Sequence, residues 1–428
     1  MEETQESTTT YQDANNIINI KGGSNITINL RNKNDPFNVT LAKEVISAIR
    51  PYSDKADKCL STVLTAEGWN KKTDPLGKAL LAIMDSYDNM IGSKLRSVFA
   101  IGKEKYSEDQ LERYIKSCIA VAKTTLQLLC FTLISDLWNK EKENPDSFNL
   151  TPEESSKISA FFEYSGELEY DLGQYLELFQ MVYQIYCHQP PTKLPIAELE
   201  GFGEKFKPDS DFYKACVQLS IIQRTDIGEQ YTDKNSTLSE LSLTIILVSL
   251  NFLAAYKMIS IKSVNYNDLR SAEPHFLHKY VTLGQNTMET PGTKGVNYLK
   301  SAVSADSILF YKNDYINDSI NLFPFIIDYN SLTSRSNENA DSVNICVFNA
   351  VGSVEEKNKV GKVIGTNDTM RFSSDDNTDK TITNSGLLQS GEEIDFSYLF
   401  KDDEAWVQFK CDNVFVQFWD AKKTLVGA

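Results

Sequence analysis

The segment "YSEDQLERYIKSCIAVAKTTLQLLCFTLISDLW", Tyr106 to Trp138, predicts a long buried helix. Ser107 and Gln110 have the spacing of a capping box, in which the two side chains satisfy exposed backbone N–H groups at a helix start. Apolar residues then recur three and four positions apart, as on one face of a helix: Leu111, Ile115, Cys118, Ile119, Ala122, Leu126, Leu129, Leu133 and Trp138. The segment therefore predicts the central helix of a bundle.

Helix signals continue on both sides of this segment. Asp35-Pro36 and Thr151-Pro152 each place a capping residue before a proline, which is a common helix start, and Glu154 completes a second capping box. Residues 238–259 are apolar nearly all round, which is typical of a helix at the centre of a bundle. We expect about six to eight helices between residues 35 and 283.

The composition of the chain changes after residue 283. Residues 284–300 are rich in Gly, Thr, Pro and Asn, which predicts a linker. Beyond them, short runs rich in Ile, Val, Phe, Tyr and Trp alternate with turn residues, among them "SVNICVFNA", "AWVQFKC" and "NVFVQFW". This pattern predicts that residues 301–428 form a sandwich-like β-rich domain.

The N-terminal segment "NNIINIKGGSNITINL", Asn15 to Leu30, alternates isoleucine with polar residues on both sides of Gly22-Gly23. Such alternation around a glycine pair predicts a β-hairpin within residues 1–34. The predicted fold class is therefore a multidomain α+β protein: an N-terminal β-hairpin, an α-helical bundle and a C-terminal antiparallel β-rich domain.

Two isolated strands are marginally stable in water, so the hairpin is expected to pair with a further surface. The segment has low charge, with Lys21 as its only charged residue. It could therefore also stack with the same segment of other copies, with the Asn and Ile side chains aligned. The segment resembles the short amyloid-like signalling segments that precede helical domains in bacterial and fungal immune proteins. This resemblance implies self-assembly through Ile18, Ile20, Ile26, Ile28 and Leu30, while pairing within one chain or in an ordinary dimer stays open.

Charge and cysteine content restrict the class of protein further. The formal net charge of −16 argues against general nucleic-acid binding. The seven cysteines are widely spaced without a C-x-x-C pair, which predicts buried thiols and neither a disulfide framework nor a zinc cluster. "MEETQESTTT" has no signal-peptide character, and Leu241–Tyr256 is too short to span a bilayer, so we expect a cytoplasmic protein that does not enter membranes.

No nucleotide-binding glycine motif, nucleophile elbow or H-E-x-x-H motif is present, so no cofactor or metal is predicted. Paired carboxylates can hydrolyse glycosides or hold magnesium, but a solvated acidic face explains the acidic cluster equally well. That cluster comprises Glu163, Glu167, Glu169, Asp171 and Glu177.

The segment "YNDLRSAEPHFLHKY", Tyr266 to Tyr280, concentrates two of the three histidines. Its Arg270-x-x-x-x-His275 spacing resembles the R-x4-6-H motif of HEPN ribonucleases, in which a bundle helix presents both residues to RNA. The resemblance implies a metal-independent ribonuclease with Arg270, His275 and His278 as catalytic candidates, although Pro274 would interrupt the required helix. The same histidines could bind a metal with Glu273, or could simply satisfy nearby polar groups.

The segments "EPHFLHKYVTLG" and "INLFPFIIDYNSL" resemble parts of uncharacterised bacterial proteins of conflict and antiviral systems. Together with the N-terminal segment, they imply a non-catalytic sensor or adaptor of a bacterial defence system. Such a protein would act by protein binding and homo-oligomerisation. The alternatives are the HEPN-like ribonuclease and a structural or scaffold protein.

Overall fold

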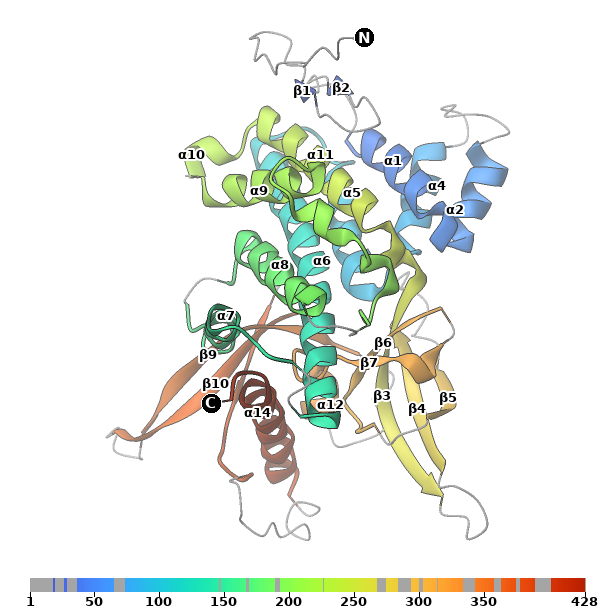
Figure 1. Ribbon diagram of the computed structural model, residues 1–428. Coiled ribbons are helices and arrows are strands. Elements are labelled where there is room, and N and C mark those ends of the chain that lie inside the picture. Colours follow the sequence, from blue (N-terminus) through green and yellow to red (C-terminus); the bar gives the residue numbers. More distant parts are fainter. Residues whose placement is uncertain are drawn as a thin grey trace. The chain divides into compact units, whose positions relative to one another are not determined.

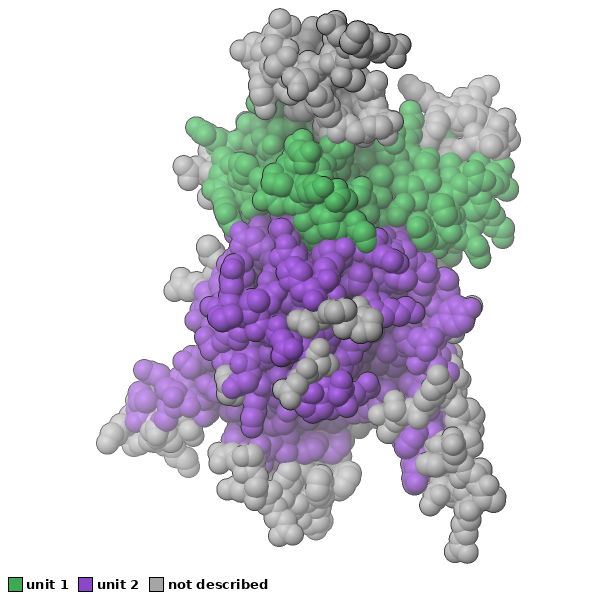
Figure 2. Space-filling view, in the orientation of Figure 1, with its two compact units in different colours: residues 1–83, 94–122, 201–251 green, residues 84–93, 123–200, 252–428 purple. Residues whose placement is uncertain are grey.

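The computed structural model describes residues 18–19, 27–28, 37–64, 74–145, 148–166, 169–188, 193–225, 227–267, 275–283, 294–299, 303–313, 315–333, 343–357, 363–374, 378–388 and 402–427. These residues form a mixed α and β protein, with helices in the N-terminal and middle regions and antiparallel sheets in the C-terminal region (Figure 1). The chain divides into two compact units, coloured separately in Figure 2. Unit 1 comprises residues 1–83, 94–122 and 201–251; unit 2 comprises residues 84–93, 123–200 and 252–428.

The N-terminal hairpin is present in the backbone. Strand β1 (Ile18–Asn19) pairs antiparallel with β2 (Thr27–Ile28), with Ile18 opposite Ile28. In the described part of the chain these two strands form a sheet of their own. Of the predicted assembly residues, only the backbones of Ile18 and Ile28 are described. Ile20, Ile26 and Leu30 lie outside the described residues.

Unit 1 is helical. Its elements are α1 (Val39–Ile49), η1 (Arg50–Tyr52), α2 (Asp54–Cys59), η2 (Leu60–Leu64), η5 (Phe202–Phe206), α9 (Asp211–Arg224), α10 (Ile227–Gln230) and α11 (Asp233–Ser249). Helices α4 (Pro75–Met84), α5 (Asn89–Ile101) and α6 (Glu108–Glu143) contribute residues to both units. Helix α11 packs against α9 and α1, and the buried stripe of α1 is Leu41, Val45 and Ile49 as its spacing predicts.

The start of α6 follows the predicted serine cap, whereas the start of α1 does not follow Asp35. The Gln110 N–H donates to Ser107 Oγ at 3.0 Å, but the Gln110 amide donates to the carbonyls of Ile101 and Glu104 and does not complete a capping box. Helix α1 begins at Val39, after Asn38 in the left-handed region with φ 67°.

Unit 2 joins helices to two antiparallel sheets. The helical elements are α7 (Pro152–Phe162), α8 (Leu172–His188), η4 (Ala197–Leu199), η6 (Asn251–Ala255), η7 (Ile316–Asp318), α12 (Tyr329–Thr333) and α14 (Asp403–Val426). The capping box of α7 at Thr151 and Glu154 is confirmed, with Pro152 in the first turn.

The first sheet of unit 2 has the strand order β5-β4-β3-β6-β7, and the second has the order β11-β10-β9-β8. The strands of the first are β3 (Tyr256–Asn267), β4 (His275–Leu283), β5 (Lys294–Leu299), β6 (Ile308–Lys312) and β7 (Ile320–Asn321). Those of the second are β8 (Ile326–Asp328), β9 (Ile345–Lys357), β10 (Val363–Ser374) and β11 (Asp379–Thr383).

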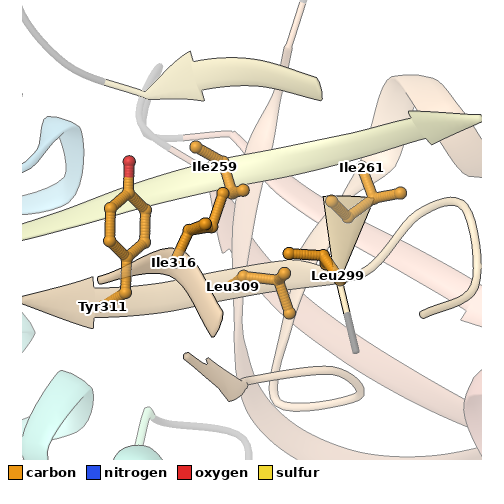
Figure 3. Packing of buried hydrophobic residues seen from close by; sticks show 6 residues of the cluster. All are labelled: Ile259, Ile261, Leu299, Leu309, Tyr311 and Ile316. Atoms are coloured by element: carbon orange, nitrogen blue, oxygen red, sulfur yellow. The ribbon is translucent and has the colours of Figure 1, made fainter. Parts of the chain in front are cut away.

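Each sheet packs against an apolar core. On the first sheet, the side chains shown in Figure 3 pack together: Ile259, Ile261, Leu299, Leu309, Tyr311 and Ile316. At the second sheet, phenylalanines from helices and strands meet, and the ring centroid of Phe418 lies 4.7 Å from that of Phe348 and 4.9 Å from that of Phe162. These three rings are almost completely buried, so the helices α7 and α14 are held by aromatic packing.

The extent of the β region differs from the prediction at both ends. Strands β3 and β4 lie within residues 35–283, which were predicted to be helical, and β5 lies within the predicted linker 284–300. The apolar run at 238–259 therefore contains a helix, a short 3₁₀ turn and the start of a strand, because periodicity does not separate a buried helix from a buried strand.

The predicted strands "AWVQFKC" and "NVFVQFW" are wrong, because residues 403–426 form α14. Asp402 caps the helix by accepting hydrogen bonds from Glu404 N and Ala405 N, and Gly427 ends it with φ 70°. The side chains of Val414, Phe418 and Ala421 are buried at helical spacing. Packing on the phenylalanine core thus overrides the β-branched and aromatic composition of the segment.

Candidate functional site

The described residues of the ribonuclease alternative, His275 and His278, lie on a strand and not on a helix. Arg270 lies outside the described residues, and only the backbone of His275 is described, as the first residue of β4. Residues 275–283 are extended and pair with β3. The described structure therefore lacks the helical setting that the HEPN motif requires.

His278 is buried and its two ring nitrogens are both engaged. Nε2 accepts a hydrogen bond from Val303 N at 2.9 Å, and Nδ1 lies 3.0 Å from the carbonyl oxygen of Phe276. The tautomer that satisfies both contacts carries its proton on Nδ1. His278 thus connects β4 to the chain after β5, which is a structural role.

The acidic cluster is dispersed in the structure. Glu163 pairs with Lys422, and the hydrogen bonds from Lys422 and Ser159 lower the pKa of the Glu163 carboxyl. Asp171 accepts a hydrogen bond from Gln174 N and caps the start of α8. Glu177 is exposed, and Glu167 lies outside the described residues. The described carboxylates do not form a catalytic pair.

The chain builds a buried polar centre where β3 meets β8. The register of β3 with β4 shifts between Ile261 and Ser263, so Lys262 is the extra residue of a β-bulge. Its ammonium group pairs with Asp328, which is fully buried, and lies 3.0 Å from Ser331 Oγ. Asp328 also accepts hydrogen bonds from Ser260 Oγ at 2.8 Å and Ser331 Oγ at 3.0 Å.

A second buried ion pair lies in the same region. Asp306 precedes β6 with φ 84°, donates its N–H to the Ile261 carbonyl at 2.9 Å, and pairs through its carboxylate with Lys410 of α14. Burial raises the pKa of the Asp306 carboxyl, against the opposing effect of Lys410.

The contact between Ser331 and Lys262 resembles a nucleophile beside a base, but the hydrogen bonds of the two side chains do not suit that role. A base would have to accept the hydroxyl proton, whereas here the Ser331 hydroxyl donates to Asp328 and Lys262 Nζ donates to both side chains. The carboxylate instead has four donors around it, including the Asn344 N–H at 3.0 Å. We therefore interpret this centre as a structural tie between β3, β8 and α12.

The second sheet contains a corresponding bulge. Arg371 lies opposite Ala350 and Phe372 lies opposite Phe348, so Asn349 is the extra residue in β9. The Asn349 amide donates to Glu169 Oε1 at 3.3 Å, and Glu169 also pairs with Lys123 of α6. In both sheets, a bulge thus turns a polar side chain toward a carboxylate on another element.

Toward its turn, each long hairpin leaves the core. Figure 1 shows the far halves of β3 and β4, and of β9 and β10, extending beyond the helices of unit 2. We define the β3 tip as Ser263–Asn267 and the β9–β10 tip as Gly352–Lys357 with Val363–Asp368. The side chain of Tyr266 is 58% exposed, and that of Val354 is 47% exposed, in strands whose bases are buried.

The β3 tip has one edge without a strand partner among the described residues. Strand β6 pairs with β3 only from Tyr256 to Ser260, while β4 covers the opposite edge as far as Asn267. The tip sequence, "SVNYN", contains no charged residue. Its open edge therefore offers backbone hydrogen-bonding groups without the charges that commonly block strand addition.

Lys262, Asp328 and Asn349 were not identified from the sequence, and Glu169 was identified only as a member of the acidic cluster. Lys262 and Asp328 follow the largely apolar runs "MISI" and "FPFII", where a charged residue indicates either a strand end or a paired buried charge. Asn349 interrupts the apolar run "ICVFNAV", residues 345–351, in the same manner. These polar interruptions were the available signal, but their partners could not be found without the tertiary structure.

Within the described ranges, no group of three or more His, Cys, Asp or Glu side chains could hold a metal ion. Helix α6 is long and apolar enough to cross a membrane, but 89% of its most apolar window is buried, as in the core helix of a soluble protein. No protein-family model, curated protein or solved structure matches the chain.

Proposed function

We propose that the protein acts by binding and self-assembly, as a sensor or adaptor, and not by catalysis. The observation that carries this proposal is the N-terminal hairpin, whose two short strands pair only with each other in the described part of the chain. An isolated pair of strands is marginally stable and gains stability from an added strand or surface.

The polar centres of unit 2 also support this proposal, because their side chains are engaged in structural contacts. Lys262, Asp328 and Ser331 satisfy one another, and His278 uses both ring nitrogens in structural contacts. The defence setting and the protein partner follow from the resemblance of Asn15–Leu30 to immune assembly segments. A cytoplasmic location belongs to the same proposal.

The test is deletion of Asn15–Leu30 from the otherwise complete chain. We expect the intact chain to form an oligomer and the deletion variant to be a monomer, as measured by analytical ultracentrifugation over a range of concentrations. Far-ultraviolet circular dichroism provides the control that both chains are folded. An oligomer of the same mass in both proteins would contradict the proposal.

A further inference from the structure

We propose that the open edge of the β3 tip receives the segment Asn15–Leu30 of a second copy of this chain as an added strand. This inference rests on the proposed self-assembly and names the surface that accepts the segment. Strand addition of this kind uses main-chain hydrogen bonds for affinity and neighbouring side chains for specificity.

The backbone geometry identifies the groups that face this edge. Ile261 directs its N–H to the Ser307 carbonyl and its carbonyl to the Asp306 N–H, both on the side of β6. Backbone groups of a strand alternate between its two edges, and the bulge at Lys262 shifts that alternation by one residue. Val264 and Tyr266 therefore direct their N–H and carbonyl groups toward the open edge.

The side chains of the β3 tip match those of the N-terminal segment in character. The tip carries the exposed Asn265, and Asn15–Leu30 contains asparagines among its isoleucines. Aligned asparagine amides can bond along stacked strands, and neither sequence carries a charge that would oppose pairing except Lys21. The exposed side chain of Asn265 is available for such a ladder.

We choose this edge over the edges of the β9–β10 tip because those edges carry a charge and a register irregularity. The exposed Glu355 places a negative charge on the β9 side, and β10 contains an irregularity between Val363 and Gly365. Charges and bulges are the usual means by which edge strands avoid further pairing. In the described β3 tip, residues 263–267 pair with β4 in regular register and include neither feature.

The test replaces Tyr266 by proline in the full chain. Proline removes one outward N–H and is tolerated at a strand edge, so the hairpin with β4 should persist. Tyr266→Ala is the matched control, because it removes the ring but keeps the N–H. We expect Tyr266→Pro to be monomeric in analytical ultracentrifugation, and Tyr266→Ala to assemble with at most a slightly weaker association.

A second variant guards against misfolding of the proline variant. Asn265→Lys adds a charge to the exposed tip without changing the backbone, and we expect it to weaken assembly by about tenfold or more. If both variants remain folded and assemble like the intact chain, the β3 edge is not the acceptor. Loss of assembly on deleting Asn15–Leu30 would then still support the proposed function, so the two proposals fail separately.

Binding in trans provides an independent measurement. A fluorescently labelled peptide of residues 15–30 should bind saturably to the chain that lacks this segment, as followed by fluorescence anisotropy. Binding should weaken by about tenfold when that chain also carries Asn265→Lys. A scrambled peptide of equal composition should not bind. Equal binding to both chains, or no binding to either, would overturn the inference.

Discussion

The two long hairpins of unit 2 have the same organisation but different edges. Each is buried at its base, contains one bulge at a polar residue, and has an exposed tip. The β9–β10 tip carries Glu355 and a second register irregularity, whereas the β3 tip is uncharged and regular. The difference indicates that exposure does not by itself mark an interaction surface; what matters is whether the chain protects the exposed edge.

The base of the β9–β10 hairpin should show the largest effect on stability. Phe348→Ala removes a fully buried ring that contacts Phe418 and Phe372, and should lower the free energy of unfolding by about 4 kcal/mol. Urea unfolding followed by circular dichroism measures the change. Phe348→Leu keeps most of the volume and should cost less. A loss below about 1 kcal/mol for the alanine variant would contradict the assigned core.

The bulge of the β3–β4 hairpin should show the next largest effect. Lys262→Met leaves the fully buried Asp328 without its cation, which should cost about 3 kcal/mol in the same assay. The double variant Lys262→Met with Asp328→Asn should recover part of this loss, because the unpaired charge is then absent. Strictly additive losses would mean that the two side chains do not interact.

Asp306 should produce a smaller effect that depends on pH. Because the folded-state pKa of its carboxyl is raised, its stabilising contribution is complete below the ordinary aspartate pKa of 3.8 and is lost as the pH rises through the folded value. The free energy of unfolding of the intact chain, relative to Asp306→Asn, should therefore fall as the pH rises above 3.8. A parallel pH dependence of the two proteins would exclude this assignment.

The tips should show the smallest effect on stability. Val354→Thr and Tyr266→Thr replace exposed side chains, and each should change the free energy of unfolding by about 0.5 kcal/mol or less. Both can be measured by urea unfolding at low protein concentration, where assembly does not contribute. A loss comparable to that of Phe348→Ala would show that the tips belong to the core, and the comparison of base with tip would fail.

The sequence predicts the helices better than the strands of this fold. The central helix and the capping box at Thr151 are local features, because propensity, periodicity and capping act over a few residues. Helix α14 was predicted as strands, since its aromatic residues are also favourable in a sheet and its packing against Phe162 and Phe348 is not local.

The pairing of side chains in the polar centres could not be predicted from the sequence, because it too depends on contacts that are not local. The carboxylate of Asp328 is 66 residues from its partner Lys262, and Asn349 is 180 residues from Glu169. Each pair depends on a bulge that shifts strand register, and a single extra residue leaves almost no trace in a hydrophobic pattern. The open edge of the β3 tip was equally hidden, because the end of β6 determines it.

The bulge at Asn349 also sets how the β9–β10 hairpin tolerates changes in length. Deleting that one residue would restore strict alternation. Every side chain of β9 on one side of the bulge would then move to the opposite face of the sheet. At the base, such a rotation would move Phe348 away from Phe418 and Phe372, whereas residues 352–355 of the tip are exposed and would lose little packing. Odd-numbered insertions and deletions are therefore acceptable only toward the turn, and a peptide tag should be inserted there.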